Sequence, residues 1–377
     1  MGKDRLEELY FELPGIGRAQ VPESFRDLFT QPVVVRASRR AGDVLELLDG
    51  GRTVVVNGGD FTDLKVLVWY VMRFRETLEP RPGRDQGPAE RRERQDRIRD
   101  KVHRLMVPVL GEEIMGIEGA PSLEGMSEWA NWDPQEDTTY LVPARRIMRI
   151  LTDMKRRSEG MDIRALGGSI VIHPHVYVPF DQSIIDLLDA NLEAGPSDEV
   201  LDVGTGTGVL ALLAASKGAG RVVATDILDR AVLNARENAK RLGLDDRVEV
   251  RGPCDLFDCV RGKFDVIIFN PPWIRGGPRS EYEEALYDDG GMIITRFMDG
   301  VAGHLKDGGR IYLIYSDISE STGEGSITGL MELVDKKGLQ VVGDRWRVRR
   351  SRVTGTRERV HLFEIARVGT STGGQPQ

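Results

Sequence analysis

The sequence contains little cysteine, no long apolar run and no excess of basic residues. Its only two cysteines, Cys254 and Cys259, are too few for a framework of disulfides, so we expect buried or half-buried thiols in a reducing cytosol. No run of about 18 apolar residues occurs, which excludes a membrane-spanning helix. The first residues form no apolar stretch of the length that a secretory signal needs, and we therefore expect a cytoplasmic protein.

The charge balance is acidic, with 52 Lys and Arg residues against 60 Asp and Glu residues and a formal net charge of -8. General nucleic-acid binders usually carry a basic excess, so the composition argues against nucleic acid as a partner. The dense basic stretch Arg345–Arg359 is the exception. We interpret it as the exposed face of an edge strand, where charge opposes aggregation, with a contact to an anionic substrate or a nucleic acid as the alternative.

Two domains are predicted from the change in pattern along the chain. Residues 1–160 form a mostly helical accessory or substrate domain, residues 161–368 form an α/β domain, and residues 369–377 form a disordered tail. A short strand is expected at Thr53–Val56 in the first domain. Helical spacing is clearest there in three segments, Asp60–Leu78, Ala89–Leu105 and Arg145–Arg157.

The second domain alternates short apolar runs with amphipathic helices. This pattern predicts a doubly wound α/β fold with a mainly parallel, seven-stranded sheet that is covered on both faces. The last two strands, joined by an Arg-rich turn, are expected to close the sheet edge as an antiparallel hairpin. The expected strands are Val200–Val203, Arg221–Thr225, Arg247–Arg251, Phe264–Phe269, Arg310–Tyr315, Leu339–Trp346 and Arg359–Ala366.

A glycine-rich turn, EVLDVGTGTG at residues 199–208, lies between the first of these strands and a helix. Glycine allows a ligand to approach the backbone closely, and the helix that follows offers free N–H groups. One acid, Asp202, precedes the turn, and a second, Asp226, ends the next strand, where it can accept hydrogen bonds from ribose hydroxyls. A nicotinamide-type loop would carry a further glycine where Ala211 stands.

A second motif, NPPW at residues 270–273, follows a buried strand directly. The two prolines fix the backbone, so Asn270 is presented from a stiff turn at the carboxyl end of the sheet. The Asn270 side-chain oxygen and the Pro271 carbonyl can each accept one N–H of an NH2 group, which orients the nitrogen lone pair without a strong base. Trp273 can stack on a planar substrate, or it can lie in the core.

The order D-x-G-x-G-x-G, acid, acid and NPPW resembles the class I methyltransferases, which have a Rossmann-like fold and bind S-adenosyl-L-methionine. The resemblance implies that the loop contacts the methionine part of the cofactor and that Asp202 lies near its amino group. It also implies that Asp226 and Ile227 lie at the ribose, and that Asp255 accepts from the adenine amine with Leu256 or Phe257 against the ring. The implied loop contacts are Gly204, Thr205, Gly206 and Gly208, and Asn270 also lies beside the cofactor.

Within this class, the sequence is nearest in pattern to the release-factor glutamine N-methyltransferases. The segment HVYVPFDQS at 175–183 resembles the substrate-side segment of that branch, and YDDGGM at 287–292 resembles its acidic-Gly-Gly stretch. The sequence departs from the branch in having Trp273 where Tyr is usual and in its first 160 residues. The implied substrate-side residues are Tyr177, Pro179, Phe180 and Asp181.

We therefore predict an S-adenosyl-L-methionine-dependent N-methyltransferase. The acidic composition favours a small-molecule or amino-acid-like acceptor. The alternatives are a protein glutamine or an RNA base and, in another reaction class, aminocarboxypropyl transfer or cyclisation with the same cofactor. His173 and His175 have no third ligand nearby, so no metal is expected, and their packing as ordinary histidines is favoured.

Overall fold

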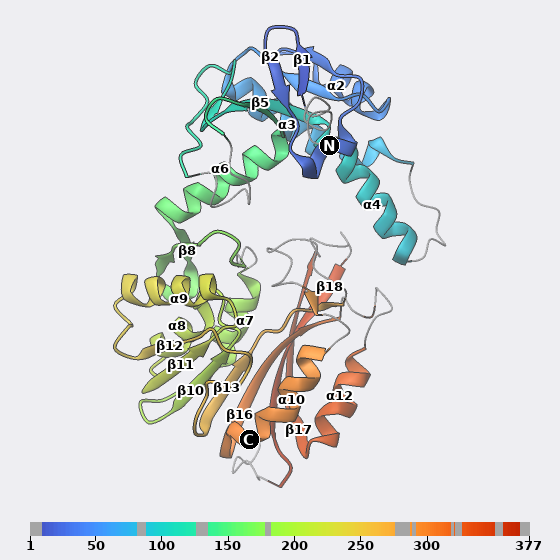
Figure 1. Cartoon of the computed structure of the whole chain (residues 1–377). Helices are drawn as coiled ribbons and strands as arrows, with labels where there is room; N and C mark the ends of the chain where they lie inside the picture. The colour runs from blue at the N-terminus through green and yellow to red at the C-terminus, as the bar shows by residue number, and fades with distance from the viewer. Residues whose placement is uncertain are drawn as a thin grey trace, which may run out of the picture. The chain divides into compact units, whose positions relative to one another are not determined.

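The computed structural model describes residues 10–80, 88–125, 135–177, 182–275, 287–288, 292–317, 320, 326–350 and 357–369. The chain forms two compact units, Met1–Lys155 and Arg156–Gln377 (Figure 1), and each is described by itself. In the described ranges, no helix combines the length and the apolarity that crossing a membrane requires.

The second unit is built on a seven-stranded sheet with the strand order β12-β11-β10-β13-β16-β18-β17. The first five strands run parallel, and β18 and β17 close the edge as antiparallel neighbours, as predicted. The doubly wound α/β fold and its mainly parallel sheet are therefore confirmed. The strands are β10 Glu199–Val203, β11 Arg221–Thr225, β12 Val248–Arg251, β13 Phe264–Phe269, β16 Leu305–Ser316, β17 Leu339–Arg350 and β18 Arg357–Arg367.

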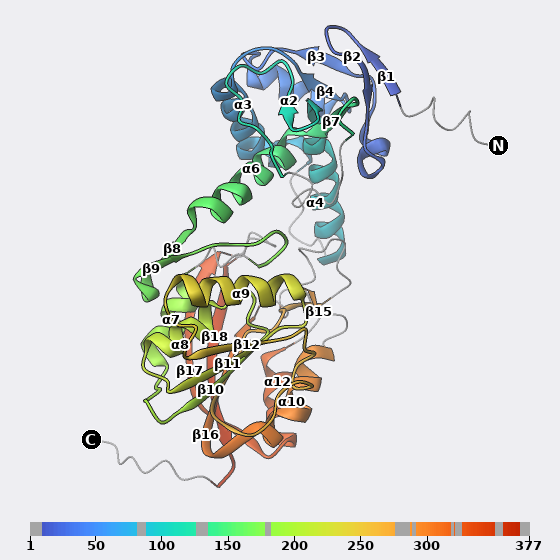
Figure 2. The ribbon, with the colours of Figure 1, turned by 60° about the vertical axis from the view of Figure 1, so that its left-hand side comes forward.

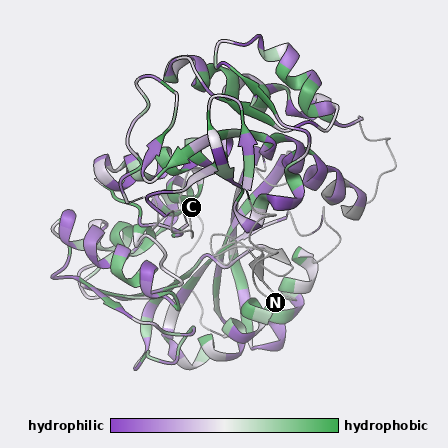
Figure 3. Cartoon of the chain, turned by 45° about the horizontal axis from the view of Figure 1, so that its top comes forward, coloured by the Kyte–Doolittle hydropathy of each residue, from purple (hydrophilic) through white to green (hydrophobic). Residues whose placement is uncertain are grey.

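Helices cover both faces of this sheet (Figures 1 and 2). Successive strand residues alternate between two cores: Val200 packs with α7, α8 and α9, whereas Leu201 packs with α10 and α12. Figure 3 shows the hydrophobic colour concentrated along the strands. The helices are α7 Ser183–Asn191, α8 Val209–Ser216, α9 Asp229–Arg241, α10 Met292–His304 and α12 Ile327–Lys336, with small pairs β8 Met161–Ile163 and β9 Gly168–Ile170, and β14 Ile274–Arg275 and β15 Tyr287–Asp288.

The first unit contains a second seven-stranded sheet, so the expectation of a mostly helical N-terminal part is wrong in this respect. The strand order is β1-β2-β7-β5-β4-β3, with β6 paired to β5. The predicted helices are present as α3, α4 and α6, and the predicted strand as β4. The strands are β1 Tyr10–Leu13, β2 Gly17–Gln20, β3 Val33–Val35, β4 Val54–Val56, β5 Leu105–Leu110, β6 Glu113–Ile114 and β7 Thr139–Pro143; the helices are α2 Ala41–Asp49, α3 Phe61–Phe74, α4 Pro88–His103 and α6 Ala144–Glu159, with 3-10 turns at Glu23–Leu28 and Arg75–Leu78.

The central strands β4, β5 and β7 of the first unit are short and almost wholly buried, and β3 consists of three half-buried valines, so these strands show no alternation of apolar and polar residues. Proline at position 108 also argues against a strand at β5, because it donates no hydrogen bond. In the structure β4 pairs with β5 only at Leu105 and Met106, so Pro108 lies beyond the end of β4. Pro108 therefore lies within a strand that pairs with β7 from Met106 to Leu110.

Candidate active site

The glycine turn after β10 adopts backbone angles that favour glycine. Gly204, Gly206 and Gly208 have φ values of 66°, 56° and 85°. A Cβ added at Gly208 would lie 3.1 Å from both Cα and Cβ of Ala235, so α9 packs directly on this turn. A Cβ added at Gly206 would have no atom within 4 Å, so the middle of the turn faces open space that a ligand can approach.

Asp202 lies buried under the turn and holds it together. Its Oδ2 accepts hydrogen bonds from the Thr205 hydroxyl at 2.6 Å and from the Ala211 amide at 3.1 Å. Burial raises the pKa of Asp202 to about 7, with a smaller contribution from the neighbouring charge of Asp226. The side chain therefore links the strand, the turn and the first turn of α8.

Because its pKa is raised on folding, Asp202 should make stability depend on pH. The folded protein keeps this proton up to about pH 7, whereas an unfolded Asp releases it near 3.8. The free energy of unfolding of the wild type, relative to an Asp202→Asn variant, should fall as pH rises from 4 to 7, by up to about 1.4 kcal/mol per pH unit. Urea unfolding of both proteins at several pH values measures this slope, and parallel profiles would contradict it.

Asp226, at the end of β11, turns its carboxylate toward the same loop. Oδ2 accepts from the Gly206 amide at 2.9 Å and Oδ1 accepts from the Leu228 amide at 3.0 Å. The residue is 8% exposed, and burial raises the pKa of its carboxyl group. Ile227, the next residue, is 56% exposed. The Ile227 amide also donates to this carboxylate, so three of its about four lone-pair sites are used and one can accept a hydroxyl from a ligand.

Two buried asparagines of α9, which the sequence analysis did not single out, connect this helix to the glycine turn and to residues 171–173. Asn238 donates to the carbonyls of Thr207 and Val171, both at 2.9 Å. Asn234 donates to Val171 at 2.9 Å and accepts from the His173 amide at 2.9 Å. Their signal in the sequence is amide side chains four residues apart on the apolar face of a helix.

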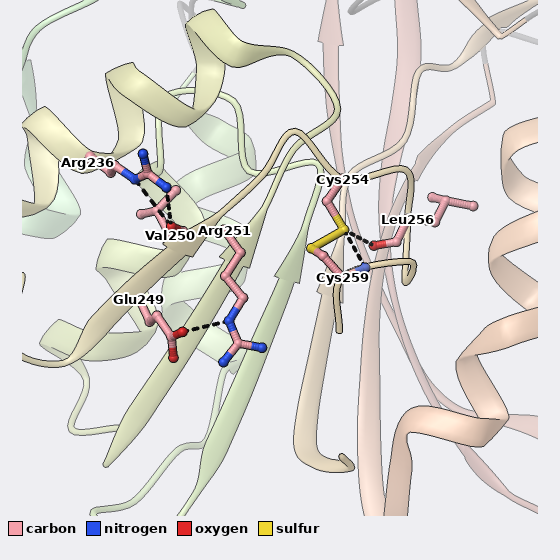
Figure 4. Close-up of a disulfide and its surroundings, with 7 residues drawn as sticks. All are labelled: Arg236, Glu249, Val250, Arg251, Cys254, Leu256 and Cys259. Carbon is pink, nitrogen blue, oxygen red and sulfur yellow. Dashed lines mark hydrogen bonds and ion pairs between the residues drawn. A yellow bond between two sulfur atoms is a disulfide. The ribbon is translucent and has the colours of Figure 1, made fainter. Parts of the chain in front are cut away.

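The prediction that the two cysteines are free thiols is wrong, because Cys254 and Cys259 form a disulfide (Figure 4). A tight turn brings their Cα atoms to 5.7 Å, within the range that a disulfide requires. The Asp258 amide donates to the Asp255 carbonyl at 3.1 Å within this turn. The Cys254 amide also donates to the Asp226 carbonyl at 2.8 Å, so the disulfide turn is tied directly to the end of β11.

The disulfide turn contains the three residues that were predicted as candidates for contacts to the adenine, and each of them packs in a different way. Asp255 accepts from Arg296 of α10 at 2.6 Å, so one of its oxygens already has a charged partner. Leu256 has a positive φ of 50° and packs on the core that α10 and α12 cover. The Phe257 ring stacks on the rings of Phe297 and His304, with centroid distances of 5.5 and 4.7 Å. Phe257 is therefore a packing residue, and Leu256 is the better candidate for contact with a ligand ring.

The NPPW motif begins where β13 ends, next to β10 in the sheet. The Asn270 side-chain oxygen is buried and has no hydrogen-bond partner among the described residues. A buried carbonyl oxygen without a donor costs free energy that a bound N–H group would recover. Pro271 is buried, and it carries the main-chain carbonyl that was predicted to act with Asn270.

Trp273 is half-buried and wedged between the two cores of the sheet. Its Nε1 donates to the Ile314 carbonyl of β16 at 3.2 Å. The Arg349 guanidinium of β17 lies over its ring, 5.0 Å from the centroid, which covers one ring face. Arg349 also donates to the buried Glu358 at 2.6 Å. The sequence analysis missed the contacts among Trp273, Arg349 and Glu358 because Trp273 is far from the other two in the sequence.

The substrate-side predictions are only partly described. Tyr177 is half-buried, whereas Pro179, Phe180 and Asp181 lie outside the described residues, as do residues 289–291 of the acidic-Gly-Gly stretch.

His173 Nε2 lies 2.7 Å from Glu237. Although burial alone would raise it, hydrogen bonds from His173 and Arg157 lower the pKa of Glu237. His173 is therefore a packing histidine with a polar partner, as favoured from the sequence.

Comparison with known proteins identifies the family. The family model described as "Methyltransferase small domain" matches residues 180–331. A Methanocaldococcus jannaschii protein named "Putative protein N5-glutamine methyltransferase" is 37% identical over 186 residues, which cover 47% of this chain and 85% of the relative. A release factor glutamine methyltransferase of Rhodopirellula baltica is 31% identical over 236 residues, 55% of this chain and 76% of the relative. The chain belongs to the methyltransferase small domain family. It is an S-adenosyl-L-methionine-dependent methyltransferase, as predicted.

A solved structure also resembles part of this methyltransferase. A methyltransferase of Pyrococcus furiosus matches with a TM-score of 0.41 and 23% identity, over 59% of this chain and 98% of that chain. The predicted resemblance to glutamine N-methyltransferases is confirmed by the relatives' sequences.

The residues around the glycine turn of the methyltransferase fit its cofactor chemically. The open space at Gly206 leaves the backbone accessible to a ligand, and the Asp226 carboxylate lies beside it, whereas Asp202 is 1% exposed and its hydrogen bonds shape the turn. The Asn270 side-chain oxygen, which has no hydrogen-bond partner among the described residues, follows β13 at the same end of the sheet as the glycine turn. Asp255 fits least well, since Arg296 competes for its carboxylate.

Proposed function

We propose that this enzyme methylates the side-chain amide nitrogen of a glutamine residue in a protein. The relatives described above are named for glutamine methylation, and none of them supports the small-molecule acceptor that the composition favoured. The observation that carries the proposal is the buried side-chain oxygen of Asn270, which has no partner in the described part of the chain, because a primary amide presents N–H groups to such an acceptor.

In this proposal Gly204, Gly206 and Gly208 hold the methionine part of the cofactor, with Asp202 near its amino group. Thr205 keeps Asp202 in place through its hydroxyl. Asp226 and the exposed Ile227 hold the ribose, and Leu256 contacts the adenine with Asp255 at its rim. When bound, the cofactor supplies an electrophilic methyl group on a sulfonium.

Asn270 and Pro271 act on the acceptor nitrogen. The lone pair of an amide nitrogen is delocalised into its carbonyl, so the nitrogen is a poor nucleophile. The Asn270 Oδ1 and the Pro271 carbonyl would each accept one N–H, which would fix the amide so that its lone pair, perpendicular to the amide plane, points toward the methyl. In the transfer an N–C bond would form as the S–C bond breaks with its electron pair left on sulfur, and the proton from the methylated nitrogen would pass to solvent, because neither carbonyl is a strong enough base to keep it. Trp273 and Arg349 hold this segment against β16.

The test is methyl transfer from isotope-labelled S-adenosyl-L-methionine to a panel of acceptors from the organism that encodes the chain. The panel contains its release factor, its ribosomal protein L11, its total tRNA and free glutamine. We expect one labelled methyl on a glutamine side chain of a protein, located by tandem mass spectrometry. Label on tRNA or on free glutamine alone, or on no member of the panel, would contradict the proposal, and methylthioadenosine as the by-product would exclude methyl transfer.

A further inference from the structure

The β17–β18 hairpin extends past the end of the large sheet at which the candidate active site lies. Ser316, the last residue of β16, pairs with Val360, and Val360 pairs with Arg347. In the described part of the chain, residues 348–350 and 357–359 therefore continue beyond β16. Since β16 runs parallel to β13, this is the end at which Asn270 follows its strand.

This end of the hairpin is strongly positive although the whole chain is acidic. Its two acids already have partners: Asp344 lies 2.9 Å from His361 Nδ1, and the buried Glu358 accepts from Arg349 at 2.6 Å and from Ser316 at 3.0 Å. The exposed arginines at this end are Arg345, Arg347, Arg350, Arg357 and Arg359.

Charged and apolar side chains alternate along β17. Arg345 and Arg347 point to one face of the strand, and Trp346 and Val348 point to the other. Trp346 and Val348 are 51% and 52% exposed. An edge strand whose charges serve only to prevent aggregation would not be expected to expose two large apolar side chains as well. The Arg359 guanidinium lies 5.1 Å from the Trp346 ring centroid and covers one of its faces.

The outer edge of β17 is open to a further strand within the described residues. β17 is the last strand of the sheet, and β18 is its partner on the other side. An edge strand presents N–H and C=O groups that an extended peptide can pair with, while alternate side chains set its specificity.

We propose that the edge of β17 from Asp344 to Arg350 binds an extended acidic segment of a protein as an added strand. Glutamate or aspartate side chains of that segment pair with Arg345 and Arg347, and its apolar side chains pack on Trp346 and Val348. The identification of this partner with the methylated protein rests on the proposed function. Peptide is favoured over RNA because RNA leaves the backbone edge unpaired and because Arg359 already covers one face of the Trp346 ring.

The experiment uses the full chain and fluorescence anisotropy with labelled probes. The probes are a short peptide in which Glu and Val alternate, a peptide of the same composition with its glutamates in one block, a Lys–Val alternating peptide, and a single-stranded oligouridylate. We expect tight binding of the alternating Glu–Val peptide alone. The double variant Arg345→Glu/Arg347→Glu should weaken it at least about ten-fold, and Trp346→Ala should weaken it several-fold.

A matched control, Arg247→Glu/Arg261→Glu, makes the same charge change on exposed arginines that precede β12 and β13, at the opposite end of these strands from Asn270, and should keep full affinity. Equal affinity of the hairpin variant and the wild type, or preference for the block peptide or the oligouridylate, would overturn the proposal. Because these assays contain no cofactor and no methyl transfer, they can succeed or fail independently of the proposed function. With the methylated protein as substrate, the hairpin variant should raise KM and leave kcat unchanged.

Discussion

Replacing Asn270 by alanine is expected to lower kcat for methyl transfer by roughly 10²- to 10³-fold, the usual effect of removing one preorganised group that acts in the transition state. The buried oxygen of Asn270 has no partner in the described structure, so its loss should not disturb folding. Cofactor affinity should be little changed, because Asp202, Asp226 and the glycine turn remain intact. Single-turnover rates with labelled cofactor measure the first effect, and calorimetric titration with S-adenosylhomocysteine measures the second.

The control is Asn191→Ala in the same unit. Asn191 donates from its side chain to the Leu187 carbonyl in its own helix, at 2.8 Å, so this variant loses an amide without touching the site. It should keep wild-type kcat. An Asn270→Ala enzyme that turns over at the wild-type rate would remove Asn270 from the mechanism, and equal losses in both variants would show only a loss of fold.

Asp226→Ala should raise the Kd for S-adenosylhomocysteine roughly 10- to 100-fold, because hydrogen bonds to a charged group contribute about 1.5–3 kcal/mol. The same carboxylate accepts from the Gly206 and Leu228 amides, so part of the effect will be disorder of the turn. Asp226→Asn retains the shape and one acceptor oxygen, and it should lie between the wild type and the alanine variant. Calorimetric titration of all three proteins gives the comparison.

Asp229→Ala provides the matched control, since Asp229 is an exposed acid three residues further along in the first turn of α9. Its Kd should equal that of the wild type. A fall in melting temperature with unchanged affinity in Asp226→Ala would make Asp226 a structural residue and would contradict its role at the ribose.

The sheet of the second unit could be predicted from sequence because strand and helix alternate there with clear periods. The glycine turn, with its left-handed φ values, follows from the same local pattern. The sheet of the first unit could not be predicted in this way. Of its strands, only the one at Thr53–Val56 was predicted. Val33–Val35 is three residues long and half-buried, too short to show a period, and β5 contains a proline.

At the candidate site, sequence reasoning found residues that lie in short local motifs and missed contacts between residues that are far apart in the sequence. Asp202, Asp226 and Asn270 lie at the ends of neighbouring parallel strands, as the topology requires. Arg296 is 41 positions from Asp255, and Arg349 reaches Trp273 only because β17 is carried beside the rest of the sheet. No local pattern carries such contacts, and the same is true of the stacking that turns Phe257 toward α10.

The disulfide turn gives the protein a built-in position for a spectroscopic label. The chain has only two cysteines, and both are in the Cys254–Cys259 ring, so the oxidised protein offers no thiol and the reduced protein offers two adjacent ones. A thiol-directed fluorophore or spin label therefore attaches at that turn and nowhere else, next to Asp255 and Leu256. Its signal can follow ligand arrival at one known place without any engineered cysteine.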